Sequence, residues 1–326
     1  MPPNLRSRRN VLAAGVGLGG FGIGGIFALK SDKDEELPGP QGFSAMLAPA
    51  GSDPLVMAHV DDVLQSGISK NVLHTLLSAS QFDDLPDALT KAFDTIPETA
   101  VDIDSVGTLL LVGSDVAKDA GGAVVWANWT ADDLVTVLES QDDTDIQSES
   151  YRGQTIYTAG ETSAAKVGET VFMFGTSTVV RDLIVSSTDD DAKPVGGKTL
   201  DSFARTPLSA HVRFSFETLG LSCNTIATSA KTSSVYDGIQ QVYGSVPDSG
   251  DEVRFHLRVD PSADRQEIAT TVRDELGTVE RDFVDNIEVT DEHDFVAIQY
   301  SHNPDEKATV ASEVLGSVVC RSNLSG

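Results

Sequence analysis

The chain has 326 residues, of which 40% are hydrophobic, enough for a sizeable core in one large domain or two ordinary ones. Its charge is strongly acidic, because 50 Asp and Glu residues stand against 23 Lys and Arg residues and give a formal net charge of −27. Such a surface repels phosphate backbones, so we exclude a nucleic-acid binder.

The acidic residues are spread along the whole chain instead of forming one tail, and Lys occurs only ten times. In about 1 M salt the Debye length falls to about 3 Å, which screens the self-repulsion of so charged a globule. The composition therefore predicts adaptation to high salt in a halophilic source, for example a halophilic archaeon. An ordinary acidic secreted protein is the alternative.

The N-terminus carries an export pattern. Ser7-Arg8-Arg9-Asn10-Val11-Leu12 resembles the twin-arginine signal, with Val11 in the place of Phe and Ala13 in the place of Lys. The resemblance implies export by the twin-arginine translocase. Two arginines before an apolar stretch also fit an ordinary positive-inside flank, and both interpretations place the chain beyond Lys30 outside the cytoplasm.

An uncharged run follows the two arginines. Residues 10–29 would span a ~30 Å hydrocarbon core as a helix. The Ala-x-Ala match Ala48-Pro49-Ala50 lies too far beyond the run for ordinary signal cleavage. We therefore expect residues 1–30 to remain as a membrane anchor, residues 31–50 to form a linker and residues 51–326 to form the ectodomain. Secretion after cleavage is the alternative.

The first part of the ectodomain shows a strand followed by helical spacing. Pro54–Val60 predicts a short strand, and the apolar positions that follow predict a helical layer within residues 54–100. Residues 107–188 then form a first unit. It contains strands at 108–112, 123–129, 154–158 and 169–174, a helix that follows an N-cap at Thr130, and a helix that carries Val179, Val180, Leu183 and Ile184.

Residues 209–320 contain a middle strand at 209–217 and then a second unit, in which the same order of elements returns from Glu252 to Val319. Glu252–Asp260 alternates apolar and polar residues, as a half-buried strand does. A helix with Asp260 as N-cap, a hairpin of 283–290 and 295–300, and a last helix after Asn303 follow. The pattern predicts an α+β fold of antiparallel sheets with helices on one face, and an internal duplication of a ββαββα unit.

The run Val171-Phe172-Met173-Phe174-Gly175-Thr176-Ser177-Thr178-Val179-Val180 joins an apolar strand to a helix through Gly and Ser/Thr residues. This unit resembles one that repeats in secreted prokaryotic families of unknown function. The resemblance covers about half of the chain. It implies an extracytoplasmic α+β protein and carries over no site residue.

Two pairs of residues are candidates for covalent modification. Cys223 and Cys320 are the only cysteines, and in an oxidising compartment they could form a disulfide; two buried free thiols are the alternative. Asn128 and Asn323 each begin a glycosylation sequon. Asn128 falls where a strand ends and a helix begins, which makes access to it doubtful.

The sequence shows no catalytic, cofactor or metal constellation. The acidic runs Asp189-Asp190-Asp191 and Asp291-Glu292-His293-Asp294 lack the spacing of a calcium loop, and no zinc pattern or Gly-x-Ser-x-Gly elbow occurs. We therefore expect no catalytic, cofactor-binding or metal residue. An enzyme, in the form of a secreted hydrolase, remains the alternative because triads are assembled in space.

One electrostatic feature points to binding. If the strands at 209–217 and 252–260 are close in one sheet, their outward residues form a positive stripe on a negative protein, made of His211, Arg213, Arg254, His256 and Arg258. Such a stripe could receive an acidic glycan or an acidic envelope protein. Alternatively, the same side chains pair across strands with acids such as Glu217 and Glu252. The sequence thus favours a non-catalytic extracytoplasmic binding or envelope protein.

Overall fold

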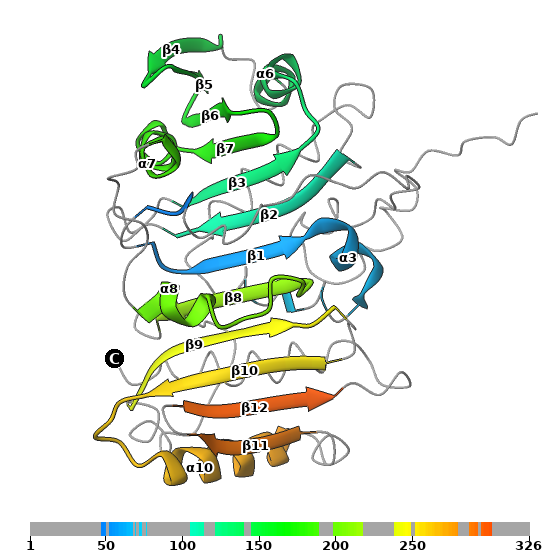
Figure 1. Cartoon of the computed structure of the whole chain (residues 1–326), viewed down its shortest axis with the longest axis vertical. Coiled ribbons are helices and arrows are strands. Elements are labelled where there is room, and N and C mark those ends of the chain that lie inside the picture. Colours follow the sequence, from blue (N-terminus) through cyan, green and yellow to red (C-terminus); the bar gives the residue numbers. More distant parts are fainter. Residues whose placement is uncertain are drawn as a thin grey trace, which may run out of the picture.

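The structure is a computed structural model. It describes residues 47–49, 52–67, 69, 72–73, 76, 105–113, 121–139, 145–188, 198–217, 238–248, 252–279, 287–292 and 295–301. These residues form one antiparallel sheet of 12 strands, in the order β11-β12-β10-β9-β8-β1-β2-β3-β7-β6-β5-β4 (Figure 1). The α+β class is confirmed, and the sheet dominates it. The helices are short and pack on that one sheet.

Short connections join strands such as β4 and β5, whereas longer segments with helices join others, such as β7 and β8. Their bounds are β1 Leu55–His59, β2 Val106–Val112, β3 Gly122–Ala127, β4 Gln147–Tyr151, β5 Gln154–Ala159, β6 Thr162–Val167, β7 Val171–Gly175, β8 Val212–Glu217, β9 Ile239–Val246, β10 Glu252–Val259, β11 Ile287–Glu292 and β12 Phe295–Ser301. The helices are α3 Val60–Gln65, α6 Ala131–Glu139, α7 Ser177–Thr188, α8 Lys198–Phe203 and α10 Arg265–Val279.

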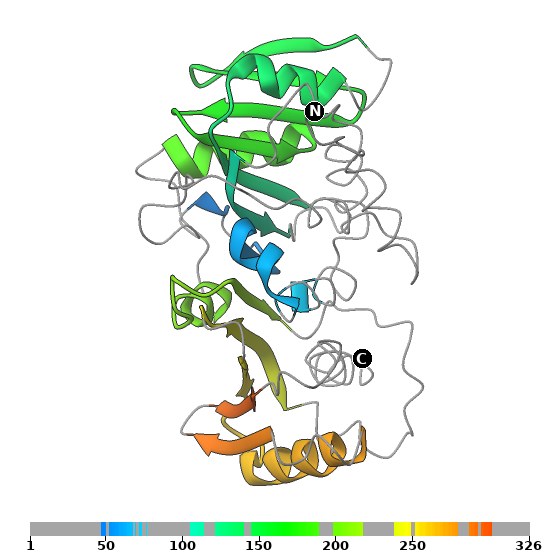
Figure 2. The same ribbon diagram turned by 90° about the vertical axis from the view of Figure 1, so that its right-hand side faces the viewer.

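Helices cover both faces of the sheet, so the prediction of helices on one face is wrong. On one face, α3, α6 and α10 pack on a core that runs the length of the sheet and includes Val63, Leu134 and Ile268. On the other face, α7 and α8 pack on a smaller core that includes Leu183 and Phe203. Figure 2 shows α10 and α8 on opposite sides of the sheet.

The apolar strands explain why two layers form. All residues of β2 and β3 are buried, and successive side chains of a strand point to opposite faces. Val124 therefore joins the core under α7, while Val125 joins the core under α6. A strand that is apolar on both sides requires a cover on both sides. The alternating strand β10 requires a cover on one side only.

The two halves of the sheet meet where β1 pairs with β8. Four residues of β1, Leu55–Ala58, are paired with Val212–Ser215 of β8, and His59 continues the contact because its backbone N–H donates to the carbonyl of His211 at 2.9 Å. The Asp53 carboxylate accepts the backbone N–H of Glu217 at 2.9 Å, at the other end of the junction. From this junction the second half of the sheet continues, because β8 pairs with β9 and β9 pairs with β10.

Most predicted elements are present, with shifted ends. The capping box of α6 is confirmed, since Thr130 and Asp133 exchange side-chain and backbone hydrogen bonds of 2.7 to 3.1 Å. Asp260 is not the cap of α10. It holds a turn through the N–H of Ser262, and Asp264 caps the helix through the N–H of Glu267.

Some predicted segments lie outside the described residues, namely the signal and anchor of residues 1–30, the linker as far as residue 46, most of the helical layer between residues 77 and 100, and the last helix after Asn303. Within the described part of the chain, no helix is long and apolar enough to cross a membrane.

Candidate functional site

The strand β10 carries the centre of the predicted stripe. Val253, Phe255, Leu257 and Val259 point into the core under α10, so Arg254, His256 and Arg258 point to the opposite face. On that face α8 packs against β8 and β9, where the Ser202 hydroxyl donates to the Gln241 side chain at 2.7 Å. Arg254 is exposed, whereas His256 and Arg258 are half-buried. We call this side of β9, β10 and β12 the open face.

Arg213 is not part of an exposed stripe, so its predicted outward position is wrong. Its side chain is fully buried beneath α8, stacked on the Phe203 ring with 4.4 Å from the guanidinium carbon to the ring centroid. It donates to the Phe203 carbonyl at 2.9 Å and to the Thr206 hydroxyl at 2.8 Å. Burial lowers the pKa of this guanidinium to about 10. Arg213 therefore holds the C-terminal end of α8 against β8.

Arg254 pairs with Glu252, as the alternative interpretation predicts, but along its own strand and not across strands. Its Nε and Nη2 donate to the two carboxylate oxygens of Glu252 at 2.7 and 3.1 Å. The hydrogen bond to Glu252 raises the pKa of Arg254. The pair is exposed on the arginine side, where 48% of the side chain is accessible. This geometry leaves part of the guanidinium fork open to solvent.

His256 is a neutral aromatic side chain in the middle of the open face. Its ring stacks on Tyr243 with centroids 4.7 Å apart and meets the edge of Phe295 at 5.0 Å. Burial, followed by the positive charges of Arg254 and Arg205, lowers its pKa to about 4. The ring is therefore uncharged at neutral pH, and its buried Nδ1 forms no hydrogen bond within the described residues.

Two further cations lie near this ring. Arg258 is two residues beyond His256 on the same side of β10, opposite Gln241 of β9 and Phe295 of β12. Arg205, in the turn after α8, is exposed and close enough to His256 to lower its pKa. Neither Arg205 nor Arg258 forms an ion pair with any described residue. We call Arg205, Arg254, His256 and Arg258 the arginine face.

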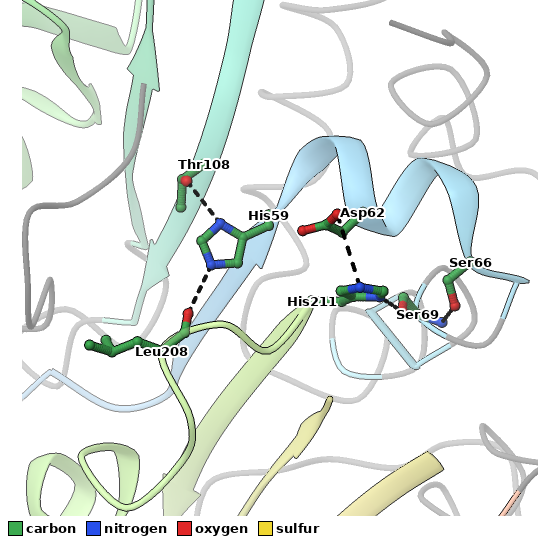
Figure 3. Close-up of polar contacts among 7 residues, drawn as sticks. All are labelled: His59, Asp62, Ser66, Ser69, Thr108, Leu208 and His211. Carbon is green, nitrogen blue, oxygen red and sulfur yellow. Dashed lines mark hydrogen bonds and ion pairs between the residues drawn. The ribbon is translucent and has the colours of Figure 1, made fainter. Parts of the chain in front are cut away.

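His211 lies apart from the arginine face, at the junction of the two halves. Its Nδ1 is 3.2 Å from the Ser69 hydroxyl, and its Nε2 is 4.0 Å from the Asp62 carboxylate (Figure 3). The neighbouring His59 is held by the Leu208 carbonyl at 3.0 Å and the Thr108 hydroxyl at 3.2 Å. Because a carbonyl can only accept, Nε2 of His59 carries the proton. The stripe therefore does not extend to His211.

Ser69, His211 and Asp62 are in the order of a catalytic triad, but their geometry does not support catalysis. Ser69 is fully buried, so its hydroxyl is closed to a substrate. The 4.0 Å separation of His211 from Asp62 is longer than a hydrogen bond. Half of the Asp62 side chain is accessible to solvent. The three residues link α3 to the start of β8.

Of the remaining predicted residues, the structure describes Asn128 and not the others. Asn128 is exposed in the connection between β3 and α6. Cys223, Cys320, Asn323, Arg8 and Arg9 lie outside the described residues. Among the residues that the structure describes, no three acidic, His or Cys side chains form a group that could hold a metal ion.

Two residues at the arginine face were not predicted from the sequence. Tyr243 belongs to β9, for which no strand was predicted, and Arg205 lies in a turn with no periodic pattern. The segment shows no period-two signal for its core residues, because a β-bulge beside Gln240 brings Ile239, Val242 and Val246 to one face at intervals of three and four residues. Phe295 was expected in a strand, but its contact with His256 depends on the pairing of β10 with β12.

Comparisons with known proteins add a distant structural likeness. No family model matches the chain, and no curated protein matches it. The chain is similar to crystal form I of TP0453, with a TM-score of 0.48 and 10% identity, over 85% of this chain and 97% of that chain. For crystal form III of TP0453 the TM-score is 0.46 and the identity 10%, over 87% of this chain and all of that chain.

Proposed function

We propose that the chain is a non-catalytic extracytoplasmic binding protein of a halophile, held at the cell membrane by residues 10–29, which receives an acidic glycan on the arginine face. The observation that carries the proposal is the pair Arg205 and Arg258. In a chain with more than two acids for each base, both guanidinium groups lack a carboxylate partner among the described residues. Arg205 lowers the pKa of His256, and Arg258 lies two residues beyond His256 on the same side of β10.

The chemistry of the face suits anionic groups on an extended polymer. Arg254 and Arg258 are four residues apart on one strand, which separates their Cα atoms by roughly 14 Å along β10. Each guanidinium can form two parallel hydrogen bonds to a carboxylate. Between them, the uncharged His256 and Phe295 offer half-buried apolar edges. A sugar acid chain presents carboxylates and apolar ring faces in alternation.

High salt determines which interactions can contribute to the affinity for an acidic glycan. Near 1 M salt, attraction over more than about 3 Å is screened, so the net charge of the face has little effect. Direct hydrogen bonds between guanidinium and carboxylate groups persist because they are made in contact. The proposal therefore depends on the fork geometry of arginine and not on long-range attraction.

Binding of polygalacturonate, measured by calorimetry in molar potassium chloride, tests the proposal. Arg258→Gln and Arg205→Gln should each weaken binding about tenfold, the effect of losing one charge-assisted hydrogen bond. Arg265→Gln is the matched control, because it makes the same change of charge at a residue that is paired with Asp291 beside α10. Equal losses in all three variants, or no binding by the unaltered chain, would contradict the proposal. Binding of an acidic protein but not the polyuronate would favour an envelope partner.

Export is tested separately. If Arg8 and Arg9 direct the chain to the twin-arginine translocase, replacement of both by Lys should retain the chain inside the cell. Protease added to intact cells should then digest the unaltered ectodomain and spare the variant. An ectodomain released into the medium without residues 1–30 would show that the anchor is cleaved.

We further propose that the ectodomain arose by duplication of one unit. The support is the strand order, in which β6-β7-β3-β2-β1 mirrors β11-β12-β10-β9-β8 on either side of the central β1–β8 pair. In addition, α6 follows β3 and α10 follows β10, and both helices pack on the same core. The strands β4 and β5 extend the first half only. A crystal structure in which one rotation fails to superpose the five strand pairs would contradict this origin.

A secreted hydrolase is the alternative function, and it would depend on the contact between Ser69 and His211. A fluorophosphonate probe that labels the unaltered chain but not Ser69→Ala would support it. Because Ser69 is fully buried, we expect no labelling.

A further inference from the structure

The sequon Asn128-Trp129-Thr130 lies in an open connection between β3 and α6. Its first and third residues are exposed, and none of the three belongs to a strand or a helix. The side-chain amide of Asn128 forms no hydrogen bond within the described part of the chain, while its backbone N–H donates to the Ser105 carbonyl at 3.2 Å. The doubt about access that the sequence raises is therefore removed.

The middle residue fixes the direction of the other two. Trp129 is 3% exposed, packs on Phe172 with ring centroids 5.4 Å apart, and accepts a 2.8 Å hydrogen bond from the Lys166 ammonium through its carbonyl. A buried tryptophan between two exposed polar residues turns both of them toward solvent. The connection is thus a surface at which a transferase can approach Asn128 without unfolding the sheet.

We propose that Asn128 is a site of N-linked glycosylation. The donor is a lipid-linked glycosyl phosphate, supplied with its transferase on the outer side of the membrane. A bond forms between Nδ2 of Asn128 and the anomeric carbon of the sugar. The bond from that carbon to the phosphate oxygen breaks, the phosphate leaves with the electron pair, and a base of the transferase takes the amide proton.

The N-cap of α6 controls access to the third residue. The Thr130 hydroxyl donates to the Asp133 carboxylate at 2.8 Å and accepts the Asp133 backbone N–H at 3.1 Å. A transferase that recognises Asn-x-Thr must contact this hydroxyl, so the cap has to open first. A single helix cap is a weak interaction, so the need to open it slows transfer without preventing it. Asp133→Ala should therefore raise the glycosylated fraction severalfold.

The experiment uses the full chain produced in a host whose exported proteins carry N-linked glycans. Trypsin releases residues 119–152, a peptide in which Asn128 begins the only sequon. Mass spectrometry should show this peptide with an added sugar mass. Asn128→Gln should remove the addition, and so should Thr130→Asn, which keeps a good N-cap and therefore the fold. Thr130→Ser keeps both cap and sequon and should retain the addition.

The inference rests on the extracytoplasmic location proposed above, and the two can fail separately. Protease-accessible chain whose 119–152 peptide is unmodified would overturn the glycosylation alone. Chain found only inside the cell would overturn both. An added mass that persists in Asn128→Gln would also overturn the assignment to this residue.

Discussion

The imidazole of His256 lies nearly parallel to the ring of Tyr243, with 4.7 Å between centroids and 12° between planes. The two residues are directly opposite in the β9–β10 ladder, so the stack is fixed by strand register. Phe295 closes the side toward β12. A histidine held in this way is packed as an aromatic residue, with two guanidinium groups nearby that oppose its protonation.

His256 should make the stability of the protein depend on pH between about 6.5 and 4. Its pKa is near 6.5 in the unfolded chain and about 4 in the folded protein, so between these values the unfolded state binds more protons and stability falls as pH falls. His256→Phe keeps the stack but removes this dependence. Relative to the unaltered protein, the variant should gain at most about 3 kcal/mol between pH 7 and pH 4.

Urea titrations in molar potassium chloride at pH 7, 5.5 and 4 measure this difference. Carboxylates also titrate in the range, but they do so in both proteins and cancel in the comparison. Free energies of unfolding that differ by the same amount at all three pH values would contradict the prediction.

Arg213 should contribute to stability much more than the exposed Arg205. Arg213→Ala would leave a cavity beneath α8 and would remove the donors to the Phe203 carbonyl and the Thr206 hydroxyl. We expect a loss of about 3 kcal/mol in the free energy of unfolding. Arg205→Ala, which removes the same side chain from an exposed turn, should change stability by no more than about 0.5 kcal/mol. Chemical denaturation followed by circular dichroism distinguishes the two, and equal losses would contradict the assignment.

The position of Arg213 illustrates what the sequence could not predict. Alternation along 209–217 correctly assigned Val212, Phe214 and Phe216 to the core, because a strand has a period of two. It could not indicate that α8, which precedes β8 in the chain, would fold back over the opposite side of that strand. A charged residue on a polar face was therefore expected in solvent, although it is fully buried.

The arginine face, like the position of Arg213, could be predicted from the sequence only in part. Arg254, His256 and Arg258 are recognisable on one side of a strand from their spacing alone. Their neighbours come from other segments. Tyr243 is opposite His256 through the register of β9, and Arg205 is in the turn that follows α8. The register that sets Tyr243 opposite His256 cannot be read from β10 alone. The strands β4 and β6 were missed for a different reason, because they contain many small or polar residues and lack an apolar run.

Two glycines should respond to alanine for different reasons. At Gly244 in β9, a Cβ atom would meet the Arg254 carbonyl oxygen and would lie 2.6 Å from Cζ of Phe214, so Gly244→Ala should separate β9 from β10 and destabilise the protein by about 2 kcal/mol or more. At Gly153 the Cβ atom would meet open space, but φ is +81°, so Gly153→Ala should cost only about 1 kcal/mol. Thermal unfolding compares the two. A milder effect at Gly244 than at Gly153 would show that the sheet relaxes around the added methyl group.

Low ionic strength should unfold the ectodomain. The chain has a net charge of −27, and ion pairs such as those of Glu149, Glu252 and Asp291 with arginines neutralise only single carboxylates. The Debye length rises from about 3 Å in 1 M salt to about 30 Å in 0.01 M salt, so carboxylates across the whole surface then repel one another. Dialysis from molar potassium chloride into dilute buffer should abolish the circular-dichroism signal of the sheet, and sucrose at matched osmolarity should not restore it. A sheet signal that persists in dilute buffer and melts cooperatively would show that the acidic surface is not an adaptation to salt.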